Sequence, residues 1–149
     1  MQIYVNVILP LPIANVYTYI LPQEYAGSVK VGARVIVPFG KSKIYTALVY
    51  EIHFSAPENV ELKSVISVLD EQSVVRSTQL RFWEWLSGYY QCTLGEVYKA
   101  ALPSGLKLES ETIISLVEDF EAEYPLKERE QKLLDCLSDK SKTVKELGA

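Results

Sequence analysis

Hydrophobic and polar positions alternate along the first part of the chain. Between Ile3 and Leu9 every second residue is aliphatic, and the run ends at the Pro-Leu-Pro of residues 10–12. A period of two residues is typical of a strand with one buried face. Further segments rich in β-branched and aromatic residues are predicted as strands, at residues 15–22, 29–40, 43–53 and 62–70. Five strands punctuated by proline and glycine, with no long helix between them, predict a small antiparallel barrel or closed sheet.

Two predicted helices follow these strands. Ser77 can cap the aromatic run at residues 78–90, which is apolar enough that we expect the helix to pack on the sheet. Thr93 and Glu96 have the Thr-x-x-Glu spacing of a capping box and open a second predicted helix at residues 94–102. A Pro-Ser-Gly triplet then ends this unit.

The last third of the chain has a different pattern. A candidate strand at residues 111–120 leads into an acidic patch, and leucines at helical spacing lie between residues 126 and 137. A polar turn and a further predicted helix from Thr143 resemble the opening of a helix-turn-helix. A second helix ending at Ala149 cannot bury its apolar face alone, so we expect a segment cut from a longer protein.

Together these elements predict an α+β protein. Its first part is a small antiparallel β-barrel-like domain with C-terminal helices, and its second part is a truncated winged-helix segment. The predicted organisation is a domain at residues 1–103, a linker with a candidate strand at 104–124, and the incomplete winged helix at 125–149.

Composition narrows the class of protein. Hydrophobic residues make up 48% and charged residues 23% of the chain, as in ordinary soluble globular proteins. No apolar run approaches the roughly 18 residues of a membrane span, and the N-terminus lacks the basic leader of a secretory signal. Two distant cysteines, Cys92 and Cys136, and a single histidine predict neither a disulfide framework nor a zinc site, as in a cytoplasmic protein.

Charge is distributed unevenly along the sequence. Residues 1–100 hold eight basic and eight acidic side chains, whereas residues 101–149 hold seven and eleven and so carry the whole net charge of −4. A generally basic nucleic-acid-binding domain is therefore excluded. Any anion-binding site must be local.

One stretch has the local charge that such a site requires. The 26 residues from Tyr25 to Tyr50 contain no Asp or Glu, and Arg34, Lys41 and Lys43 lie around its Pro-Phe-Gly turn. Aromatic residues of the neighbouring predicted strands add ring faces, and cations beside rings are typical of single-stranded nucleic-acid binding. Solubilising lysines on a hairpin edge, with the rings in the core, are the simpler interpretation, and both stay open.

The sequence offers little material for catalysis. It has no Gly-x-x-x-x-Gly-Lys-Ser/Thr loop for a nucleoside triphosphate. Its one histidine, His53, ends a predicted strand, and no Cys–His pairing is present. We predict no catalytic residue and no metal ligand in this chain. A β-barrel module that docks proteins or neighbouring domains is the alternative to a nucleic-acid-binding module.

Four segments, in order, resemble a known family. They are "LPLPIANVYTYILP", "VGARVIVPFGKSKIYTALVYEI", "LKSVISVLDEQSVV" and "LRFWEWLSGYYQCTLGEVYKAALP". They are similar to the N-terminal region of the primosomal protein N′ family, the bacterial replication-restart DNA helicases. The resemblance covers residues 3–103, and the remainder suits the start of the winged-helix domain of that family.

The resemblance implies a site for DNA. In that family the N-terminal domain recognises the free 3′ end of the nascent leading strand at a stalled fork, without reading base sequence. The residues at the family's pocket positions are Tyr17, Thr18, Gly40 and Lys63. Thr18 stands where the family has an acidic residue, so it can form a hydrogen bond to a 3′-hydroxyl but lacks the charge. Lys41, Lys43 and Arg34 are then candidate phosphate contacts beside the pocket.

The resemblance also implies what lies outside this chain. The longer protein would be an ATP-dependent 3′-to-5′ DNA helicase of the bacterial cytoplasm, associated with the nucleoid. Its ATP, Mg²⁺ and zinc sites would lie downstream, and no cofactor is expected here. Its implied partners are DNA forks, free 3′ ends and single-stranded DNA, together with single-stranded-DNA-binding protein and primosome proteins. No membrane is implied.

Overall fold

The computed structural model describes residues 2–57, 61–107, 113–117, 124–138 and 141–143. The chain forms two compact units, Met1–Ser110 and Glu111–Ala149. The first unit contains a five-stranded sheet and the second a two-stranded sheet.

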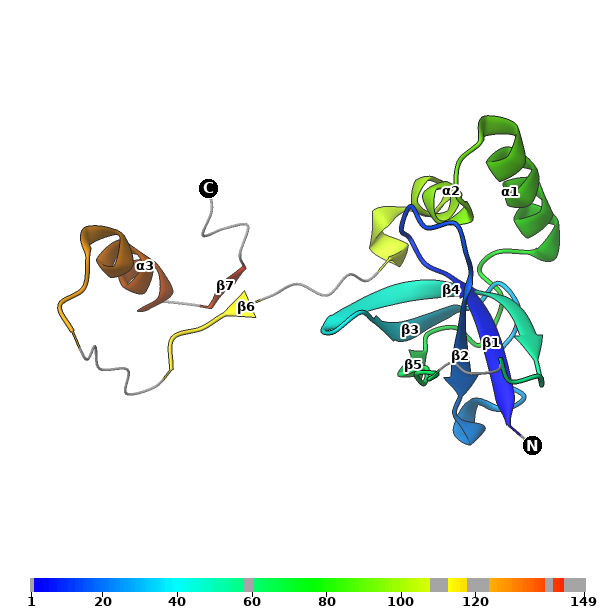
Figure 1. Cartoon of the computed structure of the whole chain (residues 1–149), viewed down its shortest axis with the longest axis horizontal. Coiled ribbons are helices and arrows are strands. Elements are labelled where there is room, and N and C mark those ends of the chain that lie inside the picture. The colour runs from blue at the N-terminus through cyan, green and yellow to red at the C-terminus, as the bar shows by residue number, and fades with distance from the viewer. Residues whose placement is uncertain (1, 58–60, 108–112, 118–123, 139–140, 144–149) are drawn as a thin grey trace. The chain divides into compact units, whose positions relative to one another are not determined.

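The first unit is built on an antiparallel sheet with the strand order β2-β1-β4-β3-β5 (Figure 1). The strands are β1 (Ile3–Ile8), β2 (Tyr17–Leu21), β3 (Arg34–Phe39), β4 (Lys43–His53) and β5 (Ser67–Val68). All five predicted strands are therefore present, although β5 occupies only two residues of the segment predicted for it.

The sheet curls into a half-barrel. The segment that precedes β5 pairs with β2 and so connects the two edges of the sheet. The backbone N–H of Ile20 in β2 donates to the carbonyl oxygen of Lys63 at 2.9 Å, and the N–H of Val65 donates to the carbonyl oxygen of Ile20 at 2.9 Å. Directly afterwards β5 pairs with β3 on the other side. One short segment thus contacts both β2 and β3, which confirms the α+β, barrel-like prediction.

The core of the half-barrel consists of alternate side chains from the strands. Its buried members include Val5, Val7, Tyr19, Leu21, Val35, Val37, Ala47, Val49 and Val65. Fully burying one aliphatic side chain of this size contributes about 1.5–3 kcal/mol, so the alternating pattern dominates the stability of this unit.

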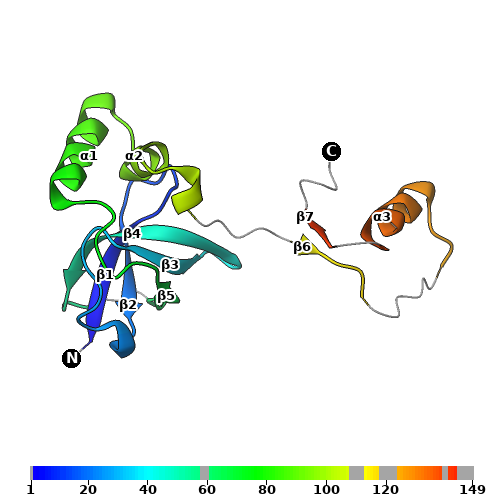
Figure 2. The same cartoon turned by 180° about the vertical axis from the view of Figure 1, so that it is seen from behind.

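Two helices cover a second hydrophobic cluster. Helix α1 (Ser77–Tyr90) contributes Leu80 and Trp83, and helix α2 (Leu94–Ala101) contributes Tyr98. Both views place the two helices beside one another at one end of the sheet (Figure 1, Figure 2). The buried hydroxyl of Tyr98 donates to the carbonyl oxygen of Thr46 at 3.0 Å, and burial raises the pKa of Tyr98. The prediction that the aromatic helix packs on the sheet is confirmed for these inward side chains.

The starts of the two helices differ in how well the sequence predicted them. The Thr93–Glu96 capping box is confirmed: Thr93 Oγ1 accepts from the N–H of Glu96 at 3.2 Å, and the Glu96 carboxylate accepts from the N–H of Thr93 at 2.9 Å. The hydrogen bonds that the backbone N–H and the hydroxyl of Thr93 donate to this carboxylate lower the pKa of Glu96. For α1 the prediction was wrong by one residue, because the N-cap is Arg76, whose N–H donates to the side chain of Gln79 at 2.9 Å.

A glycine allows α2 to lie against the loop after β1. A Cβ atom on Gly95 would lie 2.0 Å from the carbonyl oxygen of Leu11, well inside contact distance. Only glycine permits this approach without moving the backbone.

The second unit contains α3 (Glu128–Ser138) and a short antiparallel pair, β6 (Ile113–Ile114) with β7 (Lys142–Thr143). The leucine pattern therefore predicted α3 correctly. Thr143, predicted as the start of another helix, lies in β7, and the rest of that predicted helix lies outside the described residues. In the part of the chain that the structure describes, no helix has the length and apolar character needed to cross a bilayer.

Candidate nucleic-acid interface

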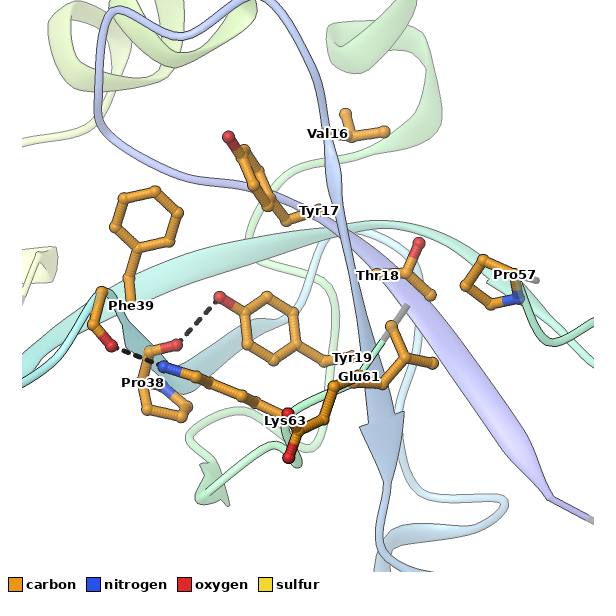
Figure 3. Close-up of a pocket in the computed structure, with 11 residues that line it drawn as sticks. Val16, Tyr17, Thr18, Tyr19, Pro38, Phe39, Pro57, Glu61 and Lys63 are labelled. Atoms are coloured by element: carbon orange, nitrogen blue, oxygen red, sulfur yellow. Dashed lines mark hydrogen bonds between the residues drawn. The ribbon is translucent and has the colours of Figure 1, made fainter. Parts of the chain in front are cut away.

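A pocket of about 360 Å³ opens beside strand β2 of the first unit. The start of β2, the turn between β3 and β4, and the segment before β5 form its walls (Figure 3). Its lining residues are Val16, Tyr17, Thr18, Tyr19, Pro38, Phe39, Gly40, Pro57, Glu61, Leu62 and Lys63. The pocket formed by these residues is called the β2 pocket below. Tyr17, Thr18, Gly40 and Lys63, predicted from three separate stretches of sequence, all line it.

Aromatic rings make one wall of the β2 pocket. The rings of Tyr17 and Phe39 meet edge to face with their centroids 5.1 Å apart, and Tyr17 stays 37% exposed. Tyr19 is buried beneath them, and its hydroxyl donates to the carbonyl oxygen of Pro38 at 3.0 Å. Burial, reinforced by the neighbouring Tyr17, raises the pKa of Tyr19 to about 12. Tyr19 therefore serves as a fixed support, and Tyr17 presents the accessible ring.

A lysine and a glycine face one another across the pocket. The ammonium group of Lys63 donates to the carbonyl oxygen of Gly40 at 2.5 Å. Gly40 has a φ of +66°, which a turn between antiparallel strands requires and which side chains disfavour. A Cβ atom at this position would meet nothing within 4 Å, so the backbone here is open to a ligand.

Thr18 lies on the other side of β2 from Tyr17 and Tyr19 (Figure 3). This placement follows from the alternation of side chains along a strand. Its hydroxyl donates to Asn6 Oδ1 of the neighbouring strand β1 at 2.7 Å. Thr18 is thus held by a side chain that the sequence did not single out.

A carboxylate also lines the β2 pocket, although the stretch that supplies Gly40 contains no acidic residue. Glu61 stands two residues before Lys63 and comes from outside the acid-free stretch. No hydrogen bond or ion pair links its side chain to another described residue. The sequence could have indicated that Glu61 lines the same site as Lys63, because residues i and i+2 of an extended segment point to the same face.

The three candidate phosphate contacts do not line the pocket. Lys41 and Lys43 are exposed at the β3–β4 turn, directly after Gly40. The guanidinium of Arg34 instead forms two hydrogen bonds with Asp70, at 2.7 and 2.9 Å, and donates to the carbonyl oxygen of Leu106 at 2.7 Å. Arg34 therefore contributes to the fold through these contacts, and its contact with a DNA phosphate stays a prediction.

Ring faces, a cation and open backbone in one pocket of a small β half-barrel are features of a nucleic-acid-binding domain. The family model described as 3′ DNA-binding domain (3′BD) of PriA matches residues 6–103, and the chain belongs to this family. A model described as winged helix domain matches residues 111–148.

Curated proteins give the same family. The chain is 32% identical over 125 residues to "Replication restart protein PriA" of Rickettsia felis, covering 83% of this chain and 16% of that protein. It is 31% identical over 104 residues to the protein of the same name from Haemophilus influenzae, covering 69% of this chain and 14% of that protein. It is 30% identical over 106 residues to the protein of the same name from Buchnera aphidicola subsp. Schizaphis graminum, covering 71% of this chain and 14% of that protein. The chain thus matches about a sixth or less of the length of these relatives.

Proposed function

We propose that this chain is the DNA-docking part of a replication-restart helicase and that the β2 pocket holds the terminal nucleotide of a free 3′ end. The end in question is that of the nascent leading strand at a stalled fork. One observation carries the proposal: in a chain of the 3′ DNA-binding domain family, Tyr17, Gly40 and Lys63 line a single pocket.

The chemistry of these residues suits a terminal nucleotide. The exposed ring of Tyr17 offers a face to a base or sugar, and such stacking contributes about 1–3 kcal/mol per base. Lys63 supplies a cation for the last phosphate, and the open backbone at Gly40 lets the ligand come close. In this arrangement Lys63 contacts a phosphate and Tyr17 stacks, and neither contact reads a base edge, so the pocket recognises an end and tolerates any sequence.

Lys41 and Lys43 extend the same site outward. Both are exposed on the turn that carries Gly40. They contact the phosphates that precede the terminal nucleotide, and such contacts give salt-sensitive, sequence-independent affinity.

The whole protein would use this docking to load in the correct orientation. It would be an ATP-dependent 3′-to-5′ DNA helicase, with its ATP, Mg²⁺ and zinc sites outside this chain. It would act in the bacterial cytoplasm at the nucleoid, with single-stranded-DNA-binding protein and primosome proteins as partners.

A second function, protein docking, is favoured by the outer face of α1. Phe82, Trp85, Tyr89 and Tyr90 are each more than half exposed, and the rings of Trp85 and Tyr89 stack with centroids 5.0 Å apart. Large exposed apolar patches often mark interaction surfaces. Docking at α1 is compatible with DNA binding at the β2 pocket, and the two are separated by the DNA test below.

Fluorescence anisotropy with a labelled partial duplex tests the main proposal. We expect the duplex with a recessed 3′-hydroxyl to bind at least several-fold more tightly than the same duplex with a 3′-phosphate. Equal affinity for the two ends would reject the pocket. Absence of binding at any salt concentration would leave the chain as a docking module.

A further inference from the structure

A group of hydrogen-bonded polar side chains lies next to the β2 pocket on strands β2, β1 and β4. Thr18 Oγ1 donates to Asn6 Oδ1 at 2.7 Å, and Asn6 Nδ2 donates to Glu51 Oε2 at 2.9 Å. His53 Nε2 lies 3.1 Å from Asn6 Oδ1, and the imidazole of His53 stacks on the ring of Tyr4. Thr18 is the one member of this group that also lines the pocket.

The sheet register places these side chains beside one another. Asn6 is the direct partner of Thr18 across the β1–β2 pair and of Glu51 across the β1–β4 pair. Directly opposed residues of antiparallel strands have Cβ atoms about 4.5–5.5 Å apart, close enough for short polar side chains to meet. The group is therefore built into the register of the strands.

The direction of every hydrogen bond in this group follows from Glu51. An ionised carboxylate only accepts, so the amide of Asn6 must turn its Nδ2 toward Glu51. Asn6 Oδ1 then faces Thr18, and an amide oxygen also only accepts. The hydroxyl hydrogen of Thr18 is consequently committed to Asn6.

This commitment determines what Thr18 can offer to a ligand. A threonine hydroxyl has one hydrogen and two lone pairs, and a freely rotating one can either donate or accept. With its hydrogen directed to Asn6, Thr18 can only accept.

We propose that Asn6 is a positioning residue that makes Thr18 an obligate acceptor and thereby selects a 3′-hydroxyl over a 3′-phosphate. This proposal rests on the proposed function of the β2 pocket. A 3′-hydroxyl has a hydrogen to donate to Thr18. An ionised 3′-phosphate presents acceptor oxygens, to which Thr18 has no hydrogen left to give.

Three DNA ends that differ only in the terminal group test the idea: 3′-hydroxyl, 3′-hydrogen and 3′-phosphate. For the unsubstituted chain we expect affinity to fall in that order, with the hydroxyl favoured over hydrogen by roughly two- to tenfold, the range of one neutral hydrogen bond. Asn6→Val removes the acceptor and frees the hydrogen of Thr18. We expect it to raise the affinity for the 3′-phosphate end relative to the 3′-hydroxyl end by about threefold or more.

Further variants distinguish the role of Asn6 from a general disturbance of the strand. Thr18→Val should bind the hydroxyl and hydrogen ends equally, and Thr18→Ser should keep the order of the unsubstituted chain. His53→Phe keeps a ring against Tyr4 and leaves the Thr18–Asn6 hydrogen bond in place, so its selectivity should not change. If Asn6→Val does not fold, Asn6→Ala is measured in its place, with the same expectation.

The outcomes separate this proposal from the proposed function. A chain that prefers the 3′-hydroxyl end, but whose selectivity against 3′-phosphate survives loss of Asn6, would overturn the role of Asn6 alone. Equal binding of all three ends by the unsubstituted chain would overturn both.

Discussion

The ammonium group of Lys63 and the carbonyl oxygen of Gly40 are joined by a hydrogen bond of 2.5 Å across the β2 pocket. The contact ties the segment before β5 to the turn between β3 and β4. It holds the cation of the pocket beside open backbone, where a phosphate can approach both. The free protein thus keeps its cation in position before any ligand arrives.

Replacing Lys63 should weaken DNA binding in a salt-dependent way. We expect Lys63→Ala to lower affinity and to reduce the slope of log K against log salt by about 1, because one phosphate contact is lost. Anisotropy titrations at several salt concentrations measure this slope. Lys30→Ala, outside the pocket lining, is the matched control. An unchanged slope in Lys63→Ala would remove this residue from the site.

Replacing Tyr17 should weaken binding without changing the salt slope. Tyr17→Ala removes a ring that is 37% exposed at the pocket and should cost about 1–3 kcal/mol of binding free energy, the range of one stacking contact. Tyr17→Phe keeps the ring and serves as the control. The same titrations give the affinity and the salt slope. We expect the plots of log K against log salt for Tyr17→Ala and for the unsubstituted chain to be parallel, with lower affinity for Tyr17→Ala. Binding by Tyr17→Ala equal to that of the unsubstituted chain would contradict stacking.

Removing the charge of Glu61 should strengthen binding. Its carboxylate lines the β2 pocket without a partner among the described residues, so it repels the phosphates of a bound strand. Glu61→Gln should raise affinity for DNA at low salt by up to roughly fivefold, since like charges about 4 Å apart in water interact by about 1 kcal/mol. The gain should be larger for a 3′-phosphate end.

Glu71→Gln is the control for this effect, because Glu71 is exposed but does not line the pocket. Equal gains in the two variants would show that only the net charge of the chain matters. A loss of affinity in Glu61→Gln would show instead that the carboxylate accepts a hydrogen bond from the DNA.

Much of the fold could be predicted because its signals are local. The alternation at Val5 and Val7, and the β-branched and aromatic runs, correspond to strands whose inner side chains form the core. The Thr93–Glu96 capping box is a contact between residues three apart, so the sequence pattern alone reveals it. The contact between Ile20 and Lys63, which draws the half-barrel together, joins residues that are distant in sequence and has no local signature.

The site was harder to predict because side-chain partners are set by register. The likeness to a known family supplied Tyr17, Gly40 and Lys63, and the structure gathers them in one pocket. Asn6 was missed because its contact with Thr18 depends on which residues of β1 and β2 lie opposite one another. The contact of Arg34 with Asp70 was missed because sequence cannot show that a partner lies 36 residues away.

The contact between Arg34 and Asp70 predicts an effect on stability that is separate from DNA binding. The ion pair is 2.7 Å long, and the side chains are only 15% and 12% exposed. Arg34→Ala removes the two guanidinium donors of the Asp70 carboxylate and leaves it only the backbone N–H of residue 34, so we expect the unfolding free energy to fall by about 1–3 kcal/mol. Urea unfolding measures this loss, and Arg81→Ala, at an exposed position inside α1, is the control. A smaller salt slope of DNA binding in Arg34→Ala would show that Arg34 also contacts a phosphate.

The same pair sets the direction of a pH effect. Hydrogen bonds from Arg34 lower the pKa of Asp70 below its ordinary value of 3.8 in the folded state. A carboxyl group whose folded pKa is lowered stabilises the fold fully above its unfolded pKa, and the stabilisation is lost as pH falls through the folded value. Urea unfolding between pH 7 and pH 3 should therefore show a smaller loss of stability below about pH 4 in Asp70→Asn than in the unsubstituted chain. Parallel pH profiles for the two proteins would show that the ion pair contributes no pH-dependent stability.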